Sequence, residues 1–146
     1  MKEVHERNNK KIKEIIGEYG WLLESEVGDD DSDAAWLIVQ HAILDQNFQE
    51  YCIPLLEFAV NNGEAKGWQL AYLQDRVLIQ KGKPQIYGTQ HELKDGKVVP
   101  KPTLEPKKVN EKRFHLGIWT QEEHTEFLQK DYNTNQEAKQ QHETRG

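Results

Sequence analysis

Two adjacent polar residues, Gln40 and His41, lie in an otherwise apolar segment that begins at Trp36, and Asp45 follows shortly afterwards. Polar groups are costly to bury unless they pair with each other or with a ligand, so they mark where a site could form. Residues four apart on a helix are neighbours, and a carboxylate bonded to an imidazole raises the basicity of the ring. His41 with Asp45 is therefore a candidate general base. The alternative is a partly buried histidine beside an aspartate that caps the next helix.

A second polar pair, Asp75 and Arg76, lies near the end of another apolar segment. Adjacent side chains on a helix diverge, so one can enter a pocket while the other forms a cap or an ion pair. The planar guanidinium suits carboxylates and phosphates, which makes Arg76 a candidate for contact with an anionic ligand. Asp75 is a second candidate partner for His41. The alternative for the arginine is an ion pair within the protein, for example with the acidic run at residues 29–33.

The segment 85–90, Gln-Ile-Tyr-Gly-Thr-Gln, carries further groups that suit a binding site. Tyr87 offers a ring and a hydroxyl, Gly88 allows close approach of the backbone, and Gln90 offers a bidentate amide. In a strand, Gln85 and Tyr87 point to one face while Gly88 and Gln90 point to the other. The alternative is a hairpin strand with a glycine bulge that packs on the helices.

The composition limits the classes of protein to consider. The chain has 146 residues and a net charge of −6, a length that fits one domain. Its basic residues are scattered among acidic ones, which argues against nucleic-acid binding because counterion release needs clustered Lys and Arg. The single cysteine, Cys52, cannot form an internal disulfide and lies in an apolar context typical of a core. Neither a membrane-spanning run nor a signal peptide is evident, so we expect no membrane partner and a cytoplasmic location.

The sequence lacks the usual metal and phosphate motifs. Residues 29–33 place three aspartates with the spacing of a calcium loop, but the loop also needs Gly and Glu where this chain has Ala34 and Gln40. There is no zinc-protease motif, cysteine pair or Walker loop. We therefore expect no metal and no cofactor, and interpret the acidic run as a helix start with Ser32 or Asp31 as its N-cap.

Hydrophobic periodicity predicts a mainly α fold, a single-domain helical bundle with a small β-hairpin. The expected helices cover residues 3–19, 33–44, 46–61, 64–80, 111–116 and a segment from 120 to about 131. Asp45 should cap the third of these helices, and Pro54 should kink or divide it.

Turn and cap signals complete the prediction for the second half of the chain. Asp95-Gly96 indicates the type I′ turn of a hairpin near residues 85–99. Asn110 is the expected cap of the short helix, and Thr120 with Glu123 forms a capping box for the last one. The domain should cover residues 1–131. Residues 132–146 form a polar tail that is either a helical extension or disordered.

Several blocks together resemble a known family. They include Tyr19-Gly20-Trp21, the Trp36–His41 segment, Asp75-Arg76-Val77 and Gly82-Lys-Pro-Gln-x-Tyr-Gly-Thr-Gln90. Over about residues 10–130 the chain resembles an uncharacterised bacterial family, domain of unknown function 6624 (DUF6624). The resemblance implies a mainly helical domain whose signature is the Gln-His, Asp-Arg and Tyr-Gly-Thr-Gln elements, and it implies no particular reaction. Ile43-Leu44 departs from the pattern, which disfavours a wet cleft beside His41.

Three functional hypotheses follow. The first is a pocket for a small polar or anionic ligand, for example a nucleotide-like one, with hydrolase activity left open. Its ligand-binding residues would be Trp36, Gln40, Arg76, Gln85, Tyr87, Thr89 and Gln90, and its catalytic residues His41, Asp45 and Asp75. The second is a protein-interaction module of the immunity, antitoxin or inhibitor type, whose partner is basic. The third is sequestration of a signalling nucleotide without turnover.

Overall fold

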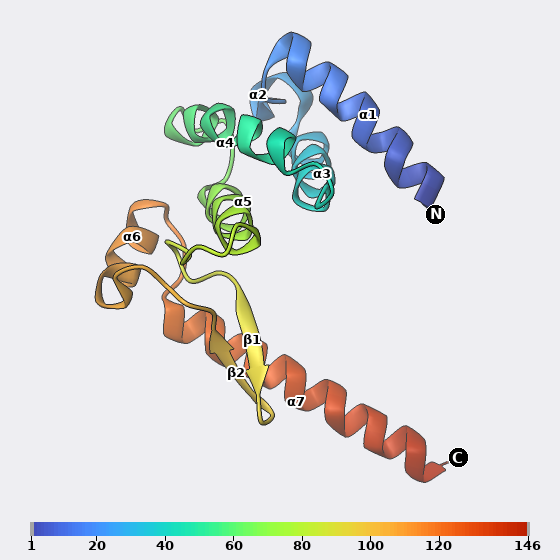
Figure 1. The fold of residues 1–146 in the computed structure, drawn as a ribbon, viewed down its shortest axis with the longest axis vertical. Coiled ribbons are helices and arrows are strands. Elements are labelled where there is room, and N and C mark those ends of the chain that lie inside the picture. Colours follow the sequence, from blue (N-terminus) through green and yellow to red (C-terminus); the bar gives the residue numbers. More distant parts are fainter. Residues whose placement is uncertain (1, 146) are drawn as a thin grey trace.

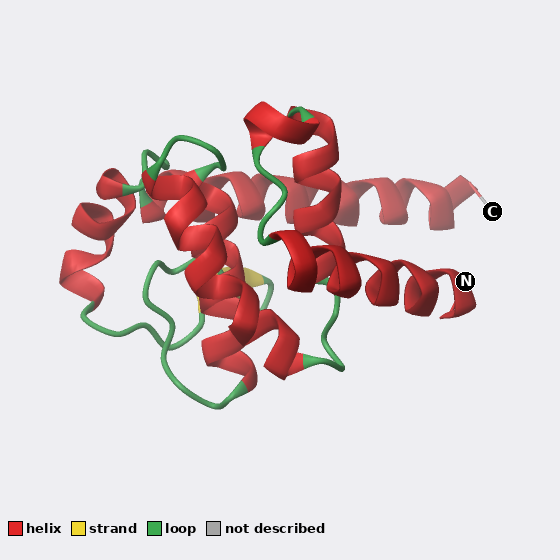
Figure 2. Ribbon diagram, turned by 90° about the horizontal axis from the view of Figure 1, so that it is seen from above, coloured by secondary structure: helices red, strands yellow, loops and turns green. Residues whose placement is uncertain are grey.

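The computed structural model describes the backbone of residues 2–145 and the side chains of residues 6–142. The elements in chain order are α1 (Lys2–Tyr19), α2 (Glu24–Val27), α3 (Asp29–Gln40), α4 (Gln46–Asn61), α5 (Gly67–Gln80), β1 (His91–Lys94), β2 (Lys97–Pro100), the 3-10 helix η1 (Pro106–Lys108), α6 (Val109–His115) and α7 (Gln121–Arg145). The fold is mainly α with a small antiparallel hairpin, as the sequence predicts. Figure 2 shows that helices dominate the molecule.

Helix α5 lies between two groups of elements (Figure 1). On one side α4 packs against α5, while α1 and α2 pack against α3; on the other side β2 packs against α7. The apolar core belongs mainly to the first group, because α1, α3, α4 and α5 each turn one apolar face inward. Its largest members are Ile16, Trp21, Trp36, Phe48, Leu56, Leu70 and Leu73.

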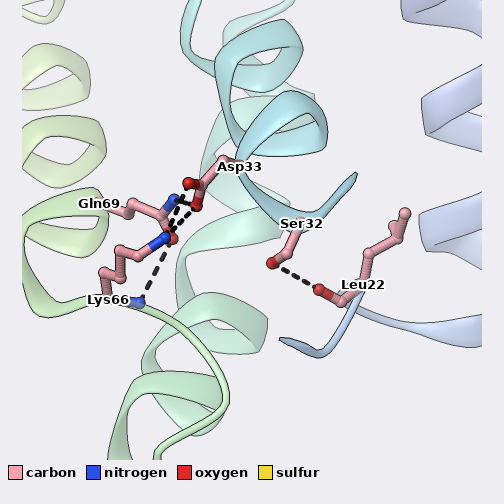
Figure 3. Close-up of polar contacts among 5 residues, drawn as sticks. All are labelled: Leu22, Ser32, Asp33, Lys66 and Gln69. Carbon is pink, nitrogen blue, oxygen red and sulfur yellow. Dashed lines mark hydrogen bonds and ion pairs between the residues drawn. The ribbon is translucent and has the colours of Figure 1, made fainter. Parts of the chain in front are cut away.

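The start of α3 differs from the prediction. The helix begins at Asp29 with Gly28 at the N-cap position, so the prediction of Ser32 or Asp31 as the cap is wrong. The hydroxyl of Ser32 instead donates to the carbonyl of Leu22 at 2.8 Å (Figure 3). Acidic side chains in the first turn are favoured by the helix dipole, which allows the helix to begin earlier than a side-chain cap would place it.

Asp33 connects this helix to the start of α5. Its carboxylate accepts hydrogen bonds from Lys66 at 2.7 Å and from the amide of Gln69 at 2.8 Å (Figure 3). The acidic run therefore forms an ion pair with Lys66, whereas the alternative that pairs it with Arg76 is not found among the described side chains. This contact fixes the beginning of α5 relative to α3.

Helix α4 is capped as predicted but is not divided. Asp45 accepts a hydrogen bond from the backbone N–H of Phe48 at 3.2 Å, the geometry of an N-cap. Of the two effects predicted for Pro54, a kink or a division of the helix, the division does not occur, since α4 continues from Gln46 to Asn61. Pro54 lies on the exposed side of α4, where water can bond the backbone carbonyl that loses its helical donor.

The hairpin is shorter than predicted. Its strands pair from His91 with Pro100 to Lys94 with Lys97, and Asp95 and Gly96 have φ of 52° and 76°, as a type I′ turn requires. Residues 85–90 form a loop instead of a strand. An isolated bridge from Gln85 to Thr103 and a backbone hydrogen bond from Lys101 to the carbonyl of Gln90 at 2.9 Å join this loop to the extended segment that follows the hairpin.

The final helices also differ in detail from the prediction. Asn110 lies inside α6 rather than at its cap, because its side chain bonds Glu122 and the backbone N–H of Gln121. The capping box of α7 is confirmed, since Thr120 and Glu123 each accept the other's backbone N–H. Helix α7 then continues to Arg145, so the tail is a helical extension up to that residue, and residue 146 lies outside the described part.

Candidate functional site

The first predicted group, Gln40, His41 and Asp45, does not assemble into a paired base. Helix α3 ends at Gln40, so the helical spacing that would bring His41 to Asp45 does not continue. His41 is exposed, and its Nδ1 donates to the carbonyl of Leu37 at 2.9 Å. Asp45 bonds Lys13 at 2.9 Å, a contact that lowers the pKa of the carboxyl. No hydrogen bond joins these two side chains, both of which lie in the described part of the chain.

Gln40 is buried, but it faces the core of the first group of helices. Its backbone carbonyl accepts a hydrogen bond from the side chain of Gln49 at 3.2 Å. Its amide oxygen has no partner among the described residues. His41 itself borders a surface hollow with Asn8, Asn9, Leu37 and Ile38. Although the two residues are adjacent, Gln40 is therefore buried and His41 lies at the surface.

Asp75 and Gln85 form the most side-chain hydrogen bonds of the predicted residues, four each, and Asp75 is the charged one. The side chain of Asp75 is completely buried. One carboxylate oxygen accepts the backbone N–H groups of Ile86 and Tyr87 at 2.8 and 3.0 Å. The other accepts the N–H and the hydroxyl of Thr89 at 2.9 and 2.8 Å. Four hydrogen bonds satisfy a buried carboxylate, so Asp75 organises the 85–90 loop.

Arg113, which was not among the predicted residues, binds backbone carbonyls on the other side of this loop. It is only 1% exposed, and it donates to the carbonyls of Tyr87 at 2.6 Å and Gly88 at 3.0 Å. A third hydrogen bond reaches the carbonyl of Trp119 at 2.9 Å. Burial lowers the pKa of Arg113, while the charge of Asp75 opposes this shift.

The amides of the loop are engaged internally. The side chain of Gln85 donates to the carbonyls of Gln90 and Lys101 and accepts the backbone N–H of Gln90 at 2.8 Å. Gln90 in turn donates from its side chain to the Thr89 hydroxyl at 3.2 Å. Gly88 has a positive φ of 67°, and a Cβ added there would overlap the side-chain oxygen of Gln121. The loop is thus closely packed.

The remaining predicted residues lie around these elements. Arg76 is half-buried, and its Nε has no partner among the described residues. Tyr87 is half-buried, and burial raises the pKa of its hydroxyl. Trp36 is buried, donates to the carbonyl of Gln69 at 2.9 Å, and contacts the ring of Trp68 edge to face at 4.8 Å between centroids. The predicted residues are therefore brought together in part, around Asp75, but not with His41.

His124 links Arg113 to helix α5. The guanidinium of Arg113 lies 3.1 Å from Nδ1 of His124, and Nε2 lies 2.9 Å from the hydroxyl of Tyr72. Because a guanidinium can only donate, Nδ1 is the acceptor and the ring proton is on Nε2. Burial, with the nearby His91 and Arg113, lowers the pKa of His124 to about 4. His124 is therefore neutral and donates to Tyr72.

His91 lies beside His124, with ring centroids 4.9 Å apart. Its Nδ1 donates to the carbonyl of Thr89 at 3.3 Å, and its Nε2 accepts from the hydroxyl of Thr125 at 3.0 Å. Burial lowers its pKa. The described residues contain no cluster of side chains suited to a metal ion, and this pair of histidines is held by hydrogen bonds of the protein.

An open hollow in the surface lies next to this network, between the beginning of α5 and the turn that precedes α7. We call it the aromatic cavity. It has a volume of about 560 Å³ and is lined by Trp68, Tyr72, Gly117, Ile118 and Trp119. Its tryptophans remain 37% and 42% exposed. The ring of Trp119 stacks on His124 at 5.1 Å, so the wall of the cavity rests directly on the buried network.

The residues of this region that the sequence analysis did not select as site residues are Trp68, Tyr72, Arg113, Trp119 and His124. One signal was available, because Tyr72 precedes Asp75 by one helical turn and shares its side of α5. Arg113 and His124 lie in polar segments that look like solvated helix faces, and only the folded chain shows that they are buried.

Comparison with known proteins places the chain in a family. A model of the family of unknown function DUF6624 matches residues 1–136, so the chain belongs to that family and the resemblance is confirmed. No curated protein and no solved structure matches the chain. In the described part of the chain, no helix has both the length and the apolar character needed to cross a membrane.

Proposed function

We propose that the protein binds a small molecule with a flat group in the aromatic cavity. The observation that carries the proposal is the position of two partly exposed tryptophans, Trp68 and Trp119, around a cavity of about 560 Å³. Ligand sites are concave, mostly apolar and supplied with a few fixed polar groups. Tyr72 supplies such a group here, and the buried contacts of His124 hold it in place.

The buried network behind the cavity supports a pre-organised site. Asp75 and Arg113 bind the two sides of the 85–90 loop, and Arg113 also bonds the backbone of Trp119. Rigid support lowers the ordering cost of binding. In this proposal Asp75, Gln85, Thr89 and Gln90 act by positioning the cavity wall and do not contact the ligand.

Binding is better supported than general-base catalysis. Both ring nitrogens of His124 are engaged, one with Arg113 and one with Tyr72. A proton taken up at Nδ1 would point at the guanidinium of Arg113 and would break the hydrogen bond between them. Sequestration without turnover is therefore the form of binding we favour, and a bound compound should leave the protein chemically unchanged. A cytoplasmic location is part of the proposal, since the unpaired Cys52 suits a reducing compartment.

The test is mass spectrometry of small molecules released when the purified protein is denatured. Trp119→Ala should lose a compound that the wild type carries. Phe114→Ala is the matched control, because it removes a nearby aromatic ring that is 80% exposed and outside the cavity. Circular dichroism checks that both variants fold. The same compound in all three proteins would overturn the proposal, as would its loss from Phe114→Ala alone.

A second candidate is a protein-interaction module. The observation that favours it is an exposed apolar stripe on α4, where Tyr51 and Phe58 lie two helical turns apart and are 51% and 69% exposed. The net charge of −6 suits a basic partner. A pull-down from the native host should then recover a partner with wild type and lose it with Phe58→Ser, while Trp119→Ala retains it.

A further inference from the structure

The aromatic cavity has a hydrogen-bonding polarity that can be traced from Arg113. The guanidinium has no acceptor, so the hydrogen bond at 3.1 Å makes Nδ1 of His124 an acceptor. A neutral imidazole then carries its proton on Nε2, which donates to the Tyr72 oxygen at 2.9 Å. The donor in one hydrogen bond therefore determines whether the next group along donates or accepts. The oxygen of Tyr72 thus accepts a hydrogen bond from within the protein.

The phenolic proton of Tyr72 is consequently directed elsewhere. Among the side chains of residues 6–142, His124 is the hydrogen-bond partner of Tyr72, and it occupies the acceptor role of the hydroxyl. Tyr72 also lines the aromatic cavity. A hydroxyl that has already accepted a bond from the protein is suited to donate its own proton to a ligand, and a ligand placed there must supply the acceptor.

The walls of the cavity limit the charge of the ligand. None of the lining residues is charged, so a desolvated cation or anion would find no opposite charge there. The buried cation Arg113 bonds the backbone of Trp119 behind the wall, but its charge is balanced by Asp75 and supplies no attraction for an ion in the cavity. Trp68 and Trp119 offer aromatic surface that favours a planar group.

Building on the proposed function, we propose that the ligand is an uncharged planar ring with a hydrogen-bond acceptor in the ring plane, such as a ring nitrogen or a carbonyl oxygen. The acceptor binds the hydroxyl of Tyr72, and the ring packs against the two tryptophans. His124 is a positioning residue that holds the hydroxyl in its donating orientation.

Three bicyclic probes of matched shape test the proposal: naphthalene, quinoline and the N-methylquinolinium cation. Affinities are measured by NMR, from the shifts of the tryptophan indole N–H signals, at a pH where quinoline is unprotonated. The wild type should bind quinoline roughly fivefold tighter than naphthalene, the value of one net hydrogen bond. N-methylquinolinium should bind more weakly than either.

Variants then assign the preference to one hydroxyl. Tyr72→Phe should keep its affinity for naphthalene and lose the preference for quinoline. Tyr132→Phe, which alters a half-buried tyrosine outside the aromatic cavity, should keep the preference. If no probe binds the wild type, the proposed function itself fails. If the probes bind but quinoline has no advantage, if Tyr72→Phe retains that advantage, or if the cation binds best, this inference is overturned while the cavity stands as a binding site.

Discussion

Asp75 and Arg113 bind opposite sides of the same turn. The carboxylate accepts N–H groups of residues 86, 87 and 89, and the guanidinium donates to the carbonyls of residues 87 and 88. The two buried charges therefore compensate each other through the peptide groups between them. This arrangement explains how a polar loop can be packed against α5 without loss of hydrogen bonds.

The first prediction concerns the charge of Asp75. Asp75→Asn keeps the shape of the side chain but removes a charged acceptor of four hydrogen bonds and leaves Arg113 uncompensated. We expect a loss of about 3 kcal/mol in the free energy of unfolding, measured in urea. Asp95→Asn is the control, because Asp95 lies in the exposed hairpin turn at φ 52°, which asparagine tolerates. Similar losses of unfolding free energy in the two variants would contradict the stabilising role of the Asp75 charge.

The second prediction compares two helical glycines. A Cβ at Gly67 would overlap the backbone carbonyl of Leu116, while a Cβ at Gly17 meets nothing within 4 Å. Gly17→Ala should stabilise the protein by up to about 1 kcal/mol through helix propensity. Gly67→Ala should instead destabilise it by about 1–3 kcal/mol, because the segment leading to Trp119 must move. Thermal unfolding measures both, and stabilisation by Gly67→Ala would refute the close approach.

The third prediction is a pH dependence that arises from His124. The pKa of His124 is lowered from 6.5 to about 4 in the folded protein, so the unfolded chain binds more protons between these values. Stability is fully present above about pH 6.5 and is lost as the pH falls towards about 4, by roughly 3 kcal/mol in total. His91 acts in the same direction.

His124→Gln tests this prediction, since glutamine can still accept from Arg113 and donate to Tyr72 but does not titrate. Urea unfolding across the acidic range should show a smaller loss of stability in the variant than in the wild type. Carboxylates titrate in both proteins, so the difference between the two curves reports the histidine. Parallel curves would rule out His124 as the source.

The fourth prediction concerns Cys52. Burial, and to a smaller extent the charge of Asp45, raises the pKa of its thiol to about 12, so very little thiolate exists at neutral pH. A thiol reagent should react with the folded protein only as fast as it opens, and rapidly in urea. Asn61→Cys in a Cys52→Ala background places a thiol on the exposed face of the same helix and should react at once. Equal rates for the two folded proteins would show that Cys52 is accessible.

Three local signals in the sequence predicted the local structure correctly, whereas the caps predicted at Ser32 or Asp31 and at Asn110 did not form. The cap at Asp45, the Asp95-Gly96 turn and the capping box at Thr120 each depend on residues close together in the chain, and each is present. The pairing of His41 with Asp45 failed because it assumed that the helix continued past Gln40. A helical spacing applies only while the helix lasts.

The candidate site depended on contacts that no local pattern contains. Asp75 was singled out, but its partners in the loop and Arg113 became evident only in the folded chain. The aromatic residues predicted to bind a ligand are Trp36 and Tyr87, whereas the partly exposed tryptophans beside the aromatic cavity are Trp68 and Trp119. An apolar side chain has the same appearance in the sequence whether it fills a core or borders a cavity.

The four tryptophans fall into two pairs with different access to solvent. Trp21 and Trp36 are 5% and 7% exposed, while the two residues of the aromatic cavity are 37% and 42% exposed. Iodide should quench the fluorescence of the second pair and leave the first as an internal reference. Occupation of the cavity would then be visible in the emission of the unlabelled protein, which allows ligands to be screened without any attached dye.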